Sequence, residues 1–131
     1  MALSKNAAEL QDAYQSRDAK AFAQLLKEDV FWGDPDDPQY PEACHNAKEV
    51  LAWYEGLIKQ GVTARVTEVI EDANMVALGL SIEWPTGVRE DPPGTRYQIF
   101  RFQDEGIDLI FGVDDRTTAI QLMREWSQRQ L

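Results

Sequence analysis

Strand-like alternation is sharpest in the stretch Met75-Val76-Ala77-Leu78-Gly79-Leu80-Ser81-Ile82-Glu83-Trp84. Large apolar side chains occupy its even positions, and small or polar ones occupy the odd positions from Ala77 to Glu83. Since successive side chains of a strand point to opposite faces, the stretch predicts a strand with one face in a hydrophobic core. The other face is flat and weakly polar, so we expect a second copy of the sheet to cover it in a homodimer.

Helical signals come before this strand. Ser4 can cap a first helix, and Asp18 a second one that carries Phe22, Leu25 and Leu26. Asn46 can cap a third helix, in which apolar residues follow helical spacing. Glu49 holds the N3 position of that helix. Gly61 follows the helix, in the place of a C-terminal stop.

Strand signals follow the third helix. Besides the quoted strand, we expect strands over residues 62–71, 96–103 and 107–113, and a last helix from about Thr117. Polar turns that follow residues 62–71 and residues 96–103 would each join two antiparallel strands. This order predicts an α+β fold, in which helices cover one face of a curved antiparallel sheet.

Size and charge restrict the possible partners. A chain of 131 residues is expected to form one domain, residues 1–131, with a sizeable core. Thirteen Lys and Arg against twenty-three Asp and Glu give a formal charge of −10, which argues against nucleic acid as a partner. The single cysteine, Cys44, excludes an internal disulfide, and no run resembles a signal peptide or a membrane span. We therefore expect a cytoplasmic protein that binds no membrane.

Asp34 is the leading candidate for chemistry. It ends a predicted short apolar strand, Val30-Phe31-Trp32-Gly33-Asp34, and is followed by Pro35. If Val30 and Trp32 face the core, alternation places the carboxylate there too, where it would hold its proton more tightly and serve as a general base near neutral pH. The alternative, which spacing alone favours, is a solvated residue that begins an acidic turn.

The order of elements and several short stretches together resemble the nuclear transport factor 2-like superfamily, which includes ketosteroid isomerases and SnoaL-like polyketide cyclases. The resemblance covers about Ala7 to Met123, and its most specific stretches are residues 18–22 through Asp34-Pro35, Trp53-Tyr54, Val66-Thr67-Glu68-Val69, Phe100-Arg101-Phe102, and Ile107 with Ile110 ahead of Asp115-Arg116. It implies a cone-shaped sheet with the N-terminal helices on its concave face, enclosing an apolar pocket. One scaffold of this kind carries many functions.

The resemblance also implies roles for individual residues. Asp34 matches the isomerase general base, and Tyr54 matches a tyrosine that supports it. The two positions that donate hydrogen bonds to the oxyanion in the isomerase fall on Leu10 and Gln98. Gln98 can still donate through its amide, and Tyr14, one helical turn after Leu10, is placed to reach the pocket.

Other branches of the superfamily match less well. SnoaL-like sequences often carry an Asp two residues after the Ile of the last strand, which is Gly112 here. The superfamily's epoxide hydrolases carry an Asp-Arg-Asp arrangement, but Arg101 alternates away from Gln98 and Phe100, so we do not expect it in such a site.

An apolar pocket wall completes the expected site. We expect the substrate to be bound by Trp32, Trp53, Leu57, Leu78, Leu80, Ile82, Trp84, Phe100 and Phe111. No metal and no cofactor is expected, because one Cys and one His do not complete a zinc set and the acidic turn lacks the glycine and distal Glu of a calcium loop.

Three function classes remain open. The first is an isomerase, cyclase or dehydratase that moves a proton on a small hydrophobic metabolite, with Asp34 as base, Tyr54 as support, and Gln98 or Tyr14 polarising a carbonyl. The second is a pocket that binds such a molecule without chemistry. The third is a dimeric interaction domain whose cavity is filled by its own side chains.

Overall fold

The computed structural model describes residues 3–37, 39–87 and 94–127. Its helices are α1 (Lys5–Ser16), α2 (Ala19–Leu25), α3 (Ala47–Lys59) and α4 (Arg116–Trp126). Its strands are β1 (Leu26–Trp32), β2 (Thr63–Asp72), β3 (Met75–Glu83), β4 (Thr95–Gln103) and β5 (Gly106–Val113). The α+β class predicted from the sequence is confirmed.

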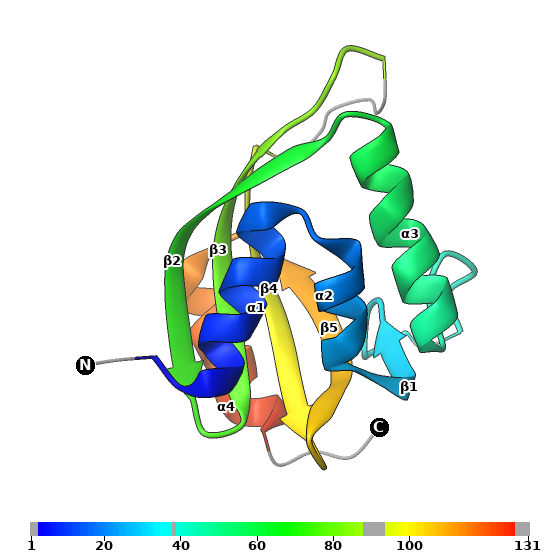
Figure 1. The fold of residues 1–131 in the computed structure, drawn as a ribbon. Coiled ribbons are helices and arrows are strands. Elements are labelled where there is room, and N and C mark those ends of the chain that lie inside the picture. Colours follow the sequence, from blue (N-terminus) through cyan, green and yellow to red (C-terminus); the bar gives the residue numbers. More distant parts are fainter. Residues whose placement is uncertain (1–2, 38, 88–93, 128–131) are drawn as a thin grey trace.

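The strands form one curved, unclosed sheet in the order β1-β5-β4-β3-β2. Strands β2 to β5 are antiparallel neighbours, as the sequence predicts, whereas β1 runs parallel to β5 and makes the sheet mixed. Helices α1, α2 and α3 lie on one side of the sheet and α4 lies behind it (Figure 1).

Three helices begin at the caps expected from the sequence. The side chains of Ser4, Asp18 and Asn46 each accept a hydrogen bond from the backbone N–H three residues later. Gly61 follows α3 with φ of +86°, a conformation that favours glycine. These local signals fix where the three helices begin and where α3 ends.

The first strand differs from the prediction. It begins at Leu26, which was expected in the second helix, and it ends at Trp32, two residues before Asp34. The chain passes from α2 into β1 with no intervening loop, because Leu26 is both the C-cap of α2 and extended, with ψ of 139°. Asp34 therefore lies outside the sheet ladder.

Two apolar cores lie on the two faces of the sheet. The first lies under α1, α2 and α3 and includes the even-numbered residues Val76, Leu78 and Phe100. The second lies between the sheet and α4, where Ala77 is fully buried. Part of the small-residue face is thus covered by α4 of the same chain. Within the described ranges, the structure contains no helix with the length and hydropathy of a membrane span.

Candidate functional site

A small pocket opens between the helices and the concave face of the sheet. We call it the concave pocket, and its volume is about 100 Å³. Its lining residues are Tyr14, Arg17, Trp32, Tyr54, Leu57, Ile58, Val62, Ala64, Leu80, Ile82, Trp84 and Gln98. Most of these side chains are apolar, so the few polar groups among them decide what the pocket recognises.

Three of those polar groups come from three different elements. Tyr14 lies on α1, Tyr54 on α3 and Gln98 on β4. The two tyrosine rings are 5.3 Å apart, and the ring of Phe100 lies 5.5 Å from that of Tyr14, edge on. Packing of this aromatic cluster fixes the two tyrosines against the sheet. The structure therefore brings together three of the four side chains for which the sequence suggested a catalytic role.

Gln98 carries an unsatisfied hydrogen-bond donor. Only 6% of the residue is exposed, and its Nε2 atom is buried with no hydrogen-bond partner among the described residues. Leaving a buried polar group without a partner costs about 1–3 kcal/mol. An acceptor on a bound molecule would recover that cost.

The two tyrosines are kept protonated by their surroundings. Burial raises the pKa of Tyr14 well above the ordinary value, and the neighbouring Tyr54 raises it further. Burial raises the pKa of Tyr54 to about 12, with the charge of Arg17 lowering it and that of Asp18 raising it. Both phenols are neutral at physiological pH, so each has an O–H that it can donate.

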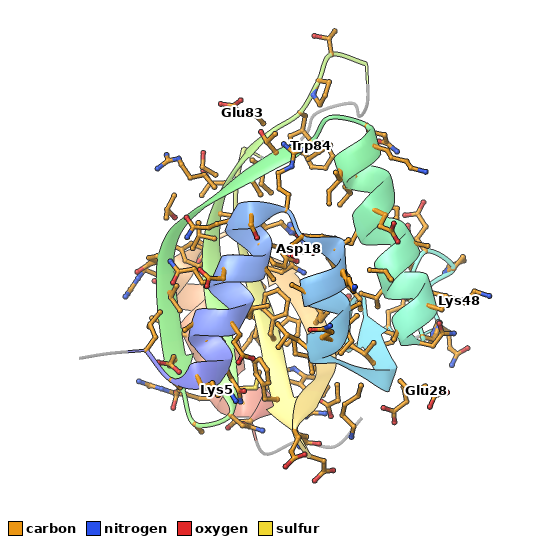
Figure 2. All side chains as sticks on the ribbon, viewed as in Figure 1. Lys5, Asp18, Glu28, Lys48, Glu83 and Trp84 are labelled. Atoms are coloured by element: carbon orange, nitrogen blue, oxygen red, sulfur yellow. The ribbon has the colours of Figure 1, made fainter. Side chains whose placement is uncertain are left out.

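Arg17 contributes the one charged side chain among the described lining residues of the concave pocket. It follows α1 as its C-cap and has a left-handed backbone with φ of 56°. Figure 2 shows the next residue, Asp18, and Trp84 toward the same end of the helical layer, with Lys5 at the other end of α1. Arg17 is exposed and also lines the pocket, so it lies where the concave pocket meets solvent.

Asp34 does not join this group. Its side chain is exposed, and its Oδ1 accepts a hydrogen bond of 2.9 Å from the backbone N–H of Asp36. It lines a second cavity of about 520 Å³, which we call the outer groove. Trp32 lines both cavities, so the two sites are neighbours that share one aromatic wall.

The expected wall residues divide among three places. Trp32, Leu57, Leu80, Ile82 and Trp84 line the concave pocket. Leu78 and Phe100 are fully buried in the first core instead. Trp53 and Phe111 line the outer groove. Trp53 is 52% exposed because it lies about 100° around α3 from Tyr54. Phe111 faces α4 because side chains alternate along β5.

The structure also locates the positions discussed above for the isomerase, SnoaL-like and epoxide hydrolase branches of the superfamily. Leu10 is fully buried in the first core. A Cβ atom at Gly112 would lie 2.5 Å from Nε of Arg96, so the guanidinium of Arg96 covers the position where SnoaL-like sequences often carry Asp. Arg101 points away from the concave pocket and pairs with Asp108. Its alternation along β4 predicted that orientation.

Arg17, Val62 and Ala64 line the pocket without having been singled out from the sequence. Val62 immediately precedes β2 and Ala64 is its second residue, so both lie where the chain enters the sheet from α3. The signal for Arg17 was its place between the expected first helix and the Asp18 cap. In the described part of the chain, no three His, Cys, Asp or Glu side chains lie close enough together to hold a metal ion.

Comparison with known families supports the fold. Residues 7–110 match the family model described as SnoaL-like domain. No curated protein matches the chain.

Solved structures match over most of the chain. A nuclear transport factor 2-like protein of unknown function from Burkholderia pseudomallei is 19% identical, with a TM-score of 0.65, over 93% of this chain and 97% of that one. A Catenulispora acidiphila protein with a ketosteroid isomerase-like fold, solved with trimethylamine, is 11% identical, with a TM-score of 0.62 over 86% of each chain. An LEH-like epoxide hydrolase of M. tuberculosis is 13% identical, with a TM-score of 0.61, over 92% of this chain and 88% of that one. At these identities the likeness is one of fold.

Proposed function

The chain belongs to the SnoaL-like domain family, and we propose that it binds a small, mostly apolar molecule with a hydrogen-bond acceptor in its concave pocket. The observation that carries this proposal is the unpartnered, buried Nε2 of Gln98, a residue that lines an apolar pocket. A carbonyl oxygen is the simplest group to accept that hydrogen bond. The protonated phenols of Tyr14 and Tyr54 supply further donors among the lining residues.

The pocket volume limits the size of the buried group. An engineered protein cavity of about 150 Å³ is known to hold benzene. At about 100 Å³ and open to solvent, the concave pocket suits one small ring or a short branched chain. A four-ring skeleton is several times larger than benzene and does not fit the concave pocket in this conformation.

NMR spectroscopy with cyclohexanone and cyclohexane tests the proposal. We expect cyclohexanone to shift the side-chain amide resonance of Gln98 saturably, and cyclohexane to bind more weakly because it cannot accept a hydrogen bond. The variant Gln98→Leu should lose the preference for the ketone, whereas Gln103→Leu, on the same strand outside the pocket, should keep it. If millimolar cyclohexanone shifts no resonance of the pocket, the proposal is wrong.

The second candidate function is proton transfer by Asp34 on a bound metabolite, as in an isomerase, cyclase or dehydratase. The observation that favours it is Trp32, which lines both the concave pocket and the outer groove that contains Asp34. A carbonyl polarised by Gln98, Tyr14 or Tyr54 would have acidified α-hydrogens for a nearby base.

Deuterium exchange separates the two candidates. An enzyme of this type would catalyse exchange of the α-hydrogens of cyclohexanone in heavy water, and Asp34→Asn would abolish that catalysis. Asp37→Asn, in the same acidic turn but outside the lining of both cavities, serves as the control. Binding without catalysed exchange would leave the first proposal standing and remove the second.

A further inference from the structure

We propose that the ligand of the concave pocket is a small apolar carboxylic acid, whose carboxylate is held by Arg17 at the mouth while an uncharged acceptor meets Gln98. This inference rests on the proposed binding function and adds the chemical class of the ligand. It follows from the kinds of polar group that line the pocket, from the pairing of the arginines, and from the backbone at Arg17.

The polar lining of the pocket is rich in donors. The guanidinium of Arg17 only donates, the orphaned atom of Gln98 is a donor, and both tyrosines hold their protons. No Asp or Glu is among the described lining residues. A ligand that complements this set carries acceptors and negative charge, whereas an amine would meet no carboxylate there.

Of the arginines that the structure describes, Arg17 and Arg65 have no carboxylate of a described residue within 4.0 Å, and only Arg17 of the two lines the concave pocket. The arginines that contact a carboxylate within 4.0 Å are Arg96, Arg101, Arg116 and Arg124. Among the described residues, no carboxylate lies that close to Arg17, although the chain has a formal charge of −10. The adjacent Asp18 uses its Oδ1 to cap α2. A cation at the mouth of an apolar pocket is thus available to an anionic ligand.

The backbone adds an independent reason. A left-handed C-cap is usually glycine, because a side chain is strained in that conformation. Here the position is Arg17, with φ of 56°. Ala73, Asp104 and Glu105 also have positive φ, but Arg17 is the one of these four that lines the concave pocket, and strained residues cluster at ligand sites.

Isothermal titration calorimetry with levulinate and methyl levulinate tests the inference. The two probes share a ketone and a short apolar chain, and they differ in the charge of the carboxyl group. We expect levulinate to bind about fivefold more tightly than its ester at low salt, as estimated for a partly exposed ion pair. That advantage should shrink as the salt concentration rises, because ions screen exposed charges.

Matched variants complete the experiment. Arg17→Gln should abolish the preference for the acid, because it weakens the binding of levulinate more than that of the ester. Lys48→Gln, which removes the same charge at the far end of α3 (Figure 2), should preserve the preference.

Each remaining outcome overturns a defined claim. Equal binding of acid and ester, unaffected by Arg17→Gln, overturns the carboxylate inference and leaves the binding function intact. If cyclohexanone binds but neither levulinate nor its ester does, the inference is likewise wrong. If none of the three compounds binds, the proposed function itself fails.

Discussion

Arg101 holds the carboxylate of Asp108 through two parallel hydrogen bonds, Nε to Oδ1 and Nη2 to Oδ2, each 2.9 Å long. The side chain of Arg101 is 2% exposed, and its Nη1 also donates to the backbone oxygen of Trp126 at 3.1 Å. The pair joins β4, β5 and the last turn of α4 on the face opposite the concave pocket. Its role is structural, since neither residue lines the pocket.

Removing one charge of this pair should destabilise the fold. Asp108→Asn leaves a buried guanidinium without its counter-charge, which costs roughly 3 kcal/mol in the free energy of unfolding. Urea denaturation followed by circular dichroism would measure the loss. Glu9→Gln removes one partner of the exposed Lys5–Glu9 pair and should change stability by no more than about 0.5 kcal/mol. Equal effects of the two substitutions would contradict this account.

The sequence predicted the fold well because its signals are local. The strand over residues 75–83 and the caps Ser4, Asp18 and Asn46 depend on neighbouring residues only, and each is found, although both faces of this strand are buried from Met75 to Leu80. The same alternation placed Arg101 correctly on the face away from Gln98.

The site was less predictable because it depends on tertiary geometry. Ending β1 at Trp32 removes Asp34 from the strand register, so alternation could not place its carboxylate. Whether Trp53 or Leu57 reaches the pocket depends on the rotation of α3 about its axis, which periodicity fixes only to within the width of an apolar stripe. Arg17 itself has the left-handed backbone conformation, and no periodic pattern in the sequence reveals such a position.

Gln98→Leu should stabilise the unliganded protein. The substitution replaces a buried donor without a partner by an apolar side chain of similar size, which removes a desolvation penalty. We expect a gain of roughly 1 kcal/mol in the free energy of unfolding, together with weaker binding of ketones. A loss of stability would mean that the amide is satisfied in solution, for instance by a bound water molecule.

The buried tyrosines predict a loss of stability at high pH. Burial raises the pKa of Tyr54 from the ordinary 10.0 to about 12, so between these values the folded protein retains a proton that the unfolded chain has lost. The contribution is therefore complete below about pH 10 and disappears as the pH rises through about 12, at up to about 1.4 kcal/mol per pH unit. Unfolding by urea at several alkaline pH values would measure this slope. Tyr54→Phe should make it shallower, and an unchanged slope would exclude Tyr54 as its source.

The homodimer expected from the small-residue face of β3 remains a prediction. Because α4 covers Ala77 and Gly79 is also buried, the surface that this strand leaves for a partner lies around Ser81. We expect light scattering at micromolar concentration to give twice the 14.9 kDa mass of one chain, and Ser81→Arg to reduce it to that of the monomer. A wild-type mass near 14.9 kDa would show that this face is exposed to solvent.

Replacing Arg17 should separate stability from binding. Arg17→Gly relieves the left-handed strain at the end of α1, so the free energy of unfolding should rise by roughly 1 kcal/mol. The same variant lacks the guanidinium, so its preference for levulinate over methyl levulinate should disappear. Gains in stability that accompany loss of function are the pattern expected where a residue is kept for binding at the expense of the fold. Urea denaturation and calorimetry on one preparation would measure both quantities. A variant that is less stable than the wild type, yet still prefers the acid, would show that Arg17 serves the helix end and not the ligand.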